Sequence, residues 1–435
     1  MGWCSARPPF NGGSGTKKER DLAMAASALS RRKFLTQSGV LGCSLAASPL
    51  MTPVSLAAAP WDRRLVVIIL RGGMDGLDAV RPYGDANFAA LRPGLLAPSQ
   101  PTGHDLDGFF AMHPDLGELM PLWRQGELGF VQAVSTPYRD RRSHFDGQDL
   151  LEAGTMGLGH RRDGWLNRLL QMQSGVVART AFAIGHGDMQ LLHGTAPVSD
   201  WSPDADLALS PQAEQLASLM MQEDPLFASA LSEALDLSRS EVELGAMASG
   251  NEDSREMAEP MMAMPRGAKG KAHLKLAEFA AKQLRGETRI ASFSLNGWDT
   301  HSYQKRGLGA ALKRLSGCIL ALKQGVGPSV WDQTAVVAMT EFGRTVRENG
   351  TGGTDHGTGG TMVLAGGAIR GGKVYGRWPG LSEAALYNRR DLMPTGDVRE
   401  VAAWIMRGLT GTSQSALENQ VFPGLQMRQD PGFLR

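Results

Sequence analysis

Five short apolar runs, each ended by a polar or glycine-rich loop, constrain the fold of this chain more than any other feature. They occupy residues 64–70, 128–134, 289–295, 335–340 and 361–365. Their length and β-branched character predict buried strands, and helical patterns lie between them. The clearest helix covers residues 308–322, and another is expected from a cap at Thr395 to about Arg407. This alternation predicts an α/β fold, with a mostly parallel central sheet and helices on both faces.

The composition excludes several classes of protein. The chain has 435 residues, of which 42% are hydrophobic and 20% charged, as in an ordinary globular protein. Its formal net charge is +1, so no general field attracts nucleic acid or an anionic membrane surface. Of the three cysteines only Cys318 lies beyond the N-terminal segment. The mature chain is therefore expected to have no internal disulfide.

The N-terminal segment is typical of an export signal. Residues 30–35, SRRKFL, precede a Gly- and Ala-rich apolar run at 40–59, which matches the twin-arginine motif. Pro49 and Pro53 interrupt this run, which is marginal for the roughly 20 residues that span a bilayer, so no stable membrane span is expected. We expect a start at Met24, cleavage after Ala57, the twin-arginine translocase as a partner, and a periplasmic or secreted location.

The domain organisation follows from these patterns. Residues 1–59 are expected to be the signal peptide with an N-terminal extension, and residues 60–435 a single domain. Residues 205–270 are rich in Met, Ala, Ser and Glu and predict an insertion of helix and loop. The methionines there are interpreted as core and surface positions and not as metal ligands.

Polar side chains follow four of the apolar runs, where the loops of a parallel sheet converge. The candidates in chain order are Arg71, Asp75, Asp78, Ser143, His144, Asn296, Asp299, His301, Glu341, Arg344, Asp355 and His356. Taken singly, such residues usually cap a helix or stay solvated. Carboxylates and imidazoles gathered from several loops suit a divalent ion such as Mn, Zn, Mg or Ca. In extended backbone, Asp299 and His301 point to the same side and could reach one ion.

The chain resembles a known family in five blocks that occur in order. These are RGGMDGLD, RSHFDGQD, NGWDTH, TEFGRT and DHGTGG, and with the export signal they resemble the exported DUF1501 proteins, whose function is unassigned. The resemblance covers residues 62–435 and implies the fold of alkaline phosphatases and sulfatases. In that superfamily a hydroxyl or modified Cys nucleophile lies beside two divalent ions held by Asp and His.

Transferred to this chain, the resemblance implies a set of site residues. Ser143 would be the nucleophile, with His144 and Arg142 as its catalytic neighbours, and Arg139 or Arg141 could bind the ester oxygens in place of Arg142. The metal ligands would be Asp75, Asp299, His301, Glu341 and His356, with Asp78 as the alternative to Asp75. Several departures stand out: Arg71 occupies the place of a ligand Asp, Glu341-Phe342 replaces an expected Asp-His pair, and no Cys is available for formylglycine chemistry.

Three functions remain open from the sequence. The first is an exported metal-dependent hydrolase of phosphate or sulfate esters, with a small-molecule or polymer substrate. The second is an inactive protein of the same fold that keeps its ion and serves in binding or assembly. The third is a redox enzyme with a nucleotide cofactor, although residues 72–76 lack the G-x-G-x-x-G spacing.

Overall fold

The central sheet is built from the apolar runs of the sequence. The computed structural model describes residues 61–96, 103–159, 163–185, 189–203 and 271–435, and all of these fall in one compact unit. The strand order is β11-β5-β10-β9-β1-β8-β6-β7, and β12 also pairs with β5. The strands are β1 (Arg64–Arg71), β5 (Leu128–Ser135), β6 (Ala181–Ile184), β7 (Ser199–Trp201), β8 (Ile290–Asn296), β9 (Thr334–Met339), β10 (Gly360–Ala365), β11 (Val374–Tyr375) and β12 (Gly396–Asp397).

One strand runs against the others. β10 pairs antiparallel with both β5 and β9, whereas every other pairing among the described strands of this sheet is parallel. The loop that precedes β10 therefore lies at the same edge as the loops that follow β1, β8 and β9. This direction decides which residues can meet.

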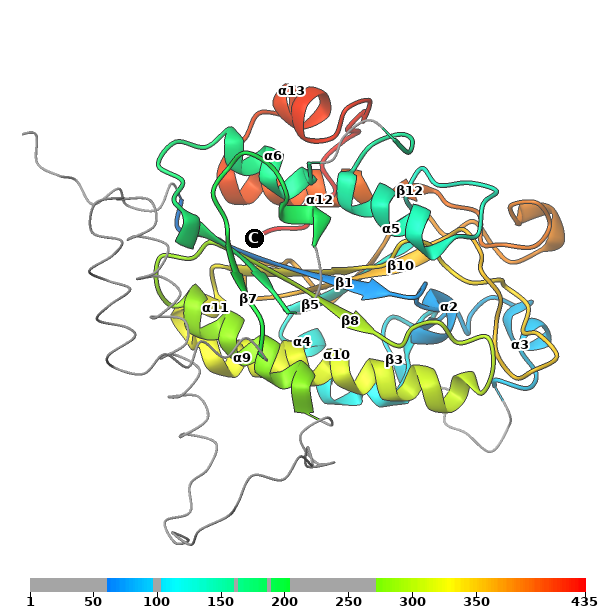
Figure 1. Ribbon diagram of the computed structural model, residues 1–435. Helices are drawn as coiled ribbons and strands as arrows, with labels where there is room; N and C mark the ends of the chain where they lie inside the picture. The colour runs from blue at the N-terminus through cyan, green and yellow to red at the C-terminus, as the bar shows by residue number, and fades with distance from the viewer. Residues whose placement is uncertain (1–60, 97–102, 160–162, 186–188, 204–270) are drawn as a thin grey trace, which may run out of the picture. The chain divides into compact units, whose positions relative to one another are not determined.

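Helices cover both faces of the sheet (Figure 1). One face carries α5, α6 and α12, and the other carries α9 and α10. The even residues of β1, from Val66 to Leu70, pack into the cluster that includes α9 and α10, and the odd residues, from Leu65 to Ile69, pack into the cluster that includes α6 and α12. Because both of its faces are covered, β1 reads as a continuous apolar run.

The helices of four or more residues are bounded as follows. They are α2 (Gly76–Ala79), α3 (Phe88–Leu91), η1 (Pro114–Leu119), α4 (Met120–Arg124), α5 (His144–Ala153), α6 (Trp165–Gln171), α9 (Ala272–Leu284), α10 (Gln304–Val326), α11 (Pro328–Trp331), α12 (Val398–Thr410) and η6 (Leu417–Val421). Shorter turns are η2 (Ala178–Thr180), η3 (Gln190–Leu192), η5 (Glu383–Ala385) and α13 (Gln414–Ala416), and a second sheet joins β2 (Val80–Arg81), β4 (Ala111–Met112) and β3 (His104–Asp105). Within the described ranges, no helix is both long and apolar enough to traverse a bilayer.

The predicted fold class is confirmed, with two corrections. A mostly parallel sheet lies between helices, and the predicted helix at 308–322 is the buried stripe of α10. The antiparallel β10 was not predicted. The cap expected at Thr395 is wrong, because α12 begins after Asp397, whose side chain accepts the Arg399 N–H. The export signal at 1–59 and the insertion at 205–270 lie outside the described residues.

Candidate metal centre at the edge of the sheet

The register of the sheet brings three strand ends to one level. Arg71 at the end of β1 pairs with Asn296 at the end of β8, and Ile69 pairs with Met339 at the end of β9. The loops that follow these strands must therefore share one space. Gly72 permits the closest approach, because it has φ +122° and a Cβ there would lie 2.6 Å from the backbone N of Asp299.

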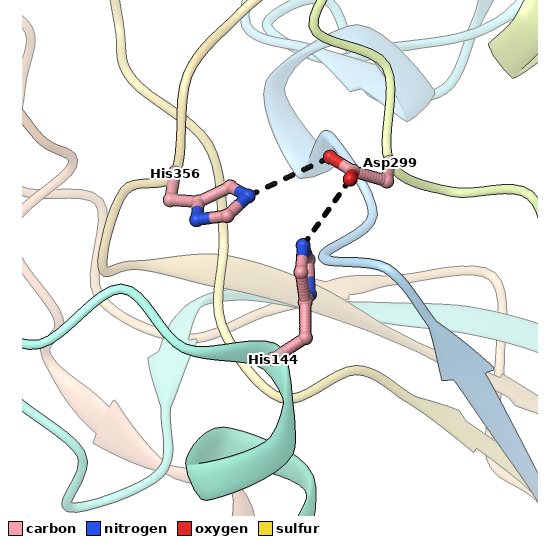
Figure 2. Close-up of side chains that lie close together, drawn as sticks. All are labelled: His144, Asp299 and His356. Atoms are coloured by element: carbon pink, nitrogen blue, oxygen red, sulfur yellow. Dashed lines mark ion pairs between the residues drawn. The ribbon is translucent and has the colours of Figure 1, made fainter.

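Two histidines, His144 and His356, lie beside the carboxylate of Asp299 (Figure 2), and His301 is a third neighbour. Asp299 Oδ2 lies 3.4 Å from His144 Nε2, and Oδ1 lies 3.5 Å from His356 Nε2. Oδ1 also lies 3.1 Å from His301 Nε2. One ligand atom each from His144, Asp299 and His356 fall within 4.8 Å of one another. The site is open to solvent, since the Asp299 side chain is 45% exposed.

The hydrogen-bond partners of the imidazoles determine which ring nitrogen faces the centre. Nδ1 of His144 lies 2.7 Å from Glu341 Oε1, and Nδ1 of His301 lies 3.2 Å from Asp355 Oδ1. Nδ1 of His356 lies 3.0 Å from the carbonyl oxygen of Arg142. Carbonyl and ionised carboxylate oxygens only accept, so each Nδ1 carries the hydrogen. In the neutral rings, each Nε2 lone pair is then directed at the space around Asp299.

This arrangement leaves the Nε2 atoms without suitable protein partners. The Nε2 atoms of His301 and His356 lie 2.9 Å apart, where two lone pairs repel unless a proton or a cation lies between them. His144 Nε2 is buried and makes no hydrogen bond, although Asp299 Oδ2 lies within ion-pair distance. Buried nitrogen atoms of this kind normally have a partner. These residues could hold a cation.

The surrounding charges keep the Asp299 carboxylate ionised and the His356 ring neutral. Burial alone raises the pKa of Asp299, but the hydrogen bond and charge of Arg344 hold that pKa below its usual value. Burial lowers the pKa of His356, and the charge of Arg344 and any proton taken up by His144 lower it further. Asp299 is therefore ionised and His356 neutral at neutral pH, which are the states that bind a metal.

Glu341, which the sequence predicted as a metal ligand, has both carboxylate oxygens occupied by protein groups. Its Oε1 accepts hydrogen bonds from His144, the Gly72 N–H at 2.8 Å and Gln148 at 3.2 Å. Its Oε2 accepts one from the hydroxyl of Thr340. Burial raises the pKa of Glu341, but these donors, led by His144, hold it below the usual value. In return, the Glu341 hydrogen bond raises the pKa of His144. Glu341 thus orients the His144 ring through a hydrogen bond to Nδ1, the ring nitrogen that does not face Asp299.

Asp75, also predicted as a metal ligand, makes its contacts outside the cluster around Asp299. It caps α2, and its Oδ2 accepts from Arg92 at 2.7 Å, Gln304 at 2.7 Å and Thr354 at 3.1 Å. Both carboxylate oxygens are thereby engaged with protein groups. Its burial among these donors explains its position at a strand end without a metal.

The predicted nucleophile lies at the first turn of α5. Ser143 is the N-cap, and its Oγ accepts the Asp146 N–H at 3.3 Å. Its own N–H donates to the hydroxyl of Tyr138 at 2.9 Å. Arg142 contributes its carbonyl oxygen to His356, while its side chain is exposed beside the site. Ser143 and His144 are therefore adjacent, but only His144 joins the cluster around Asp299.

Arg344 was among the candidate residues, but the sequence assigned it no role. Its guanidinium is fully buried and donates to Asp299 Oδ1 at 2.6 Å. It also donates to the carbonyl oxygens of Gly73, Trp298 and Thr354. This one side chain ties together the loops after β1, β8 and β9. The TEFGR segment contained it, but no local pattern distinguishes such an Arg from a solvated one.

Gln148 and Asp355 were also given no role from the sequence. Gln148 follows His144 by one helical turn on α5, so helical spacing could have placed it beside Glu341. It also accepts a hydrogen bond from Arg71 at 2.8 Å.

Phe342 packs its ring 5.0 Å from the rings of both His144 and His356 and forms an apolar wall of the site.

The family is established by comparison with known proteins. A family model described as a protein of unknown function (DUF1501) matches residues 62–399. The chain belongs to the DUF1501 family. No curated protein matches this DUF1501 chain.

Several solved structures resemble this DUF1501 member in fold. Ps i-CgsB in complex with k-i-k-neocarrahexaose is 12% identical, with a TM-score of 0.38 over 86% of this chain and 76% of that one. The lipoteichoic acid synthase LtaP from Listeria monocytogenes is 10% identical, with a TM-score of 0.35 over 87% and 80%. A 2-O GAG sulfatase is 10% identical, with a TM-score of 0.29 over 81% and 75%. At these values the likeness concerns fold alone and assigns no role to any residue here.

Proposed function

We propose that this DUF1501 protein is a metal-dependent hydrolase of phosphate or sulfate esters. His144, Asp299, His301 and His356 would hold one divalent ion. The observation that carries the proposal is the 2.9 Å approach of His301 Nε2 to His356 Nε2, with each Nδ1 committed to an acceptor. The buried, unpartnered Nε2 of His144 supports it independently.

The donor set narrows the choice of ion. Mg²⁺ and Ca²⁺ prefer sites made entirely of oxygen atoms, whereas imidazole nitrogen suits transition metals. Three imidazoles and one carboxylate therefore favour Zn²⁺ or Mn²⁺ over Mg²⁺ or Ca²⁺. Such an ion, when bound, would stabilise negative charge on an ester oxygen and lower the pKa of a nearby hydroxyl.

The side chains around the centre would carry out the remaining chemistry. Ser143 Oγ would attack the phosphorus or sulfur atom and release its proton to solvent water. The bond to the alcohol oxygen would break, and the alcohol would leave with a proton from water. A second water molecule would then hydrolyse the ester on Ser143. Free N–H groups at the start of α5 and the exposed Arg142 would bind the ester oxygens.

A second function has one observation in its favour. Ser143 already caps α5 through its Oγ, which is a complete structural reason for a serine at this position. On that basis the protein would keep its ion and bind an exported polymer without turnover. The two functions differ only in whether the Ser143 hydroxyl reacts.

Metal analysis combined with an ester screen separates these functions. Protein purified from its native compartment is analysed for bound metals and assayed on phosphomonoesters, phosphodiesters and sulfate esters. Ser143→Asn keeps an N-cap and removes the hydroxyl, so it should fold and bind metal but lose turnover. Turnover that survives in Ser143→Asn would refute the nucleophile. Stoichiometric metal with no turnover in the parent would favour the binding protein, and bound flavin or nicotinamide would favour a redox enzyme.

We also propose export through the twin-arginine route to a periplasmic or secreted location. The SRRKFL segment supports this, and the translocase would be a transient partner. Replacing Arg31 and Arg32 together with lysine should leave the protein in the cytoplasm of its host. Equal export of the paired variant in cell fractionation would overturn the proposal.

A further inference from the structure

Two aromatic side chains protrude into solvent beside the candidate metal centre. Phe145 is 83% exposed and Tyr303 is 82% exposed, which makes them the most exposed large apolar side chains among the described residues. Phe145 directly follows His144 in the first turn of α5, and Tyr303 lies two residues after His301. Since His144 and His301 both contact Asp299, the backbone positions of Phe145 and Tyr303 lie within two residues of side chains of this site.

Folding gives no reason for a ring at Tyr303. Its backbone is left-handed, with φ 51° and ψ 36°, a conformation that glycine and asparagine adopt at lower cost. It also precedes α10 at the N-cap position, where it makes no side-chain cap hydrogen bond. Hydrogen bonds from Arg306 N and Gly307 N to its carbonyl oxygen, both at 3.1 Å, hold the backbone in place. Strain that is retained in this way tends to occur at ligand sites.

Phe145 is similarly unexplained by packing. It occupies the exposed side of the first turn of α5, whereas Leu150 and Leu151 of the same helix are buried. A solvated polar residue would serve the helix as well. An apolar ring in this place stays in contact with water and gains nothing from burial. It is therefore suited to a partner that covers it.

The surroundings of the two rings indicate what covers them. Arg141 and Arg142 are exposed on the segment before Phe145, and Lys305 and Arg306 are exposed after Tyr303. Isolated aromatic rings among cations do not form the continuous apolar patch that a lipid surface or a folded protein needs. They suit a sugar, whose ring has an apolar C–H face and a polar edge, and the cations suit an anionic group on that sugar.

We propose that Phe145 and Tyr303 are stacking platforms for the sugar rings of an anionic saccharide, and that they determine the substrate class of this site. The inference rests on the proposed function for its catalytic meaning but not for binding. The ester would be a phosphate or sulfate carried by the saccharide. Its charged group would face the centre at Asp299 while neighbouring sugar rings lie on the two aromatic rings.

Binding and turnover are tested separately, with the whole chain loaded with metal. An array of neutral, sulfated and phosphorylated oligosaccharides is probed with the Ser143→Asn protein, which binds without turning over its ligand. Phe145→Ala and Tyr303→Asn should each weaken binding of the tightest oligosaccharide by about tenfold, the size expected for loss of one stacking contact. Phe145→Trp and Tyr303→Phe should restore it. Val177→Ala removes another exposed apolar side chain, just before β6 at the opposite edge of the sheet, and should change nothing.

A second readout distinguishes recognition from a general structural role. In turnover with the Ser143 protein, both variants should raise KM for the saccharide ester about tenfold more than KM for a small alkyl ester. Equal changes for the two esters, or unchanged oligosaccharide binding in both variants, would overturn the inference. Binding to phosphatidylglycerol vesicles that depends on the rings, with no oligosaccharide bound, would also overturn it. Ring-dependent saccharide binding without turnover of any ester would instead reject the hydrolase and leave this inference standing.

Discussion

Two clusters of carboxylates and cations lie at the same edge of the sheet, and they are satisfied in opposite ways. The buried cluster joins Asp75, Asp78, Arg81, Arg92 and Gln304, and each of its carboxylate oxygens accepts from a protein donor. The open cluster joins Asp299 to His144, His301 and His356, and its Nε2 atoms lack suitable donors. Residue types at strand ends are similar in both. Completeness of the hydrogen bonding, and not the residue types, separates a structural network from a site that needs a ligand.

Arg92→Met should produce the largest effect on the fold. Arg92 is fully buried and pairs with Asp75 at 2.7 Å, so its removal leaves an uncompensated buried charge. We expect a loss of about 3–5 kcal/mol in the free energy of unfolding, measured with urea. Metal bound per folded molecule should stay the same. Loss of metal with unchanged stability would reverse the roles assigned to the two clusters.

Asp299→Asn should have the converse effect. Its side chain is 45% exposed and keeps an acceptor for Arg344, so stability without metal should change by less than about 1 kcal/mol. The affinity for Zn²⁺ should fall by more than the roughly 10–100-fold that follows loss of an outer partner. Competition with a chelating dye measures this. Full metal occupancy in the variant would show that Asp299 is not a metal ligand.

Asp355→Ala should weaken metal binding through His301 alone. Asp355 is exposed and lies 3.2 Å from His301 Nδ1, so its loss frees the ring to rotate without unfolding the chain. We expect about tenfold weaker Zn²⁺ binding by the same dye competition. Asp355→Asn keeps an acceptor and is the matched control. Equal affinities in the two variants would contradict the orienting role.

Acidic pH should lower the free energy of unfolding by protonating Asp78 in the buried cluster. Burial raises the pKa of Asp78, but the charges of Arg81, His113 and Arg92 and the hydrogen bond from Gln304 hold it below its usual value. Because the folded pKa is depressed, this stabilisation is present above the unfolded pKa of about 3.9 and is lost as the pH falls through the folded value. Urea unfolding from neutral to acid pH measures it. In Asp78→Asn this part of the acid dependence should disappear, and an unaltered pH profile would count against it.

Tyr303→Gly should have the smallest effect, at the junction between the clusters. Tyr303 lies between His301 of the open cluster and Gln304 of the buried one, in a left-handed conformation. Relief of this strain should raise the free energy of unfolding by about 1 kcal/mol, measured as a higher urea midpoint. A lower midpoint in Tyr303→Gly would mean that the ring supports the fold after all.

The sequence by itself determined strands β1, β5, β8, β9 and β10, the α10 stripe and the presence of polar residues at strand ends. Apolar periodicity reports burial directly, because each residue of a strand or helix faces a definite side. Polar residues gathered at strand ends could be expected from chain order alone.

Only the tertiary structure decided what each of these polar residues contacts. The antiparallel direction of β10 brings His356 to the site from the loop before a strand. Arg92 and Gln304 donate hydrogen bonds to the carboxylate of Asp75, and His144 contacts the carboxylate of Glu341. A carboxylate looks the same in sequence whether its oxygens are occupied or free. Its partners depend on strand register and loop packing, which no local pattern encodes.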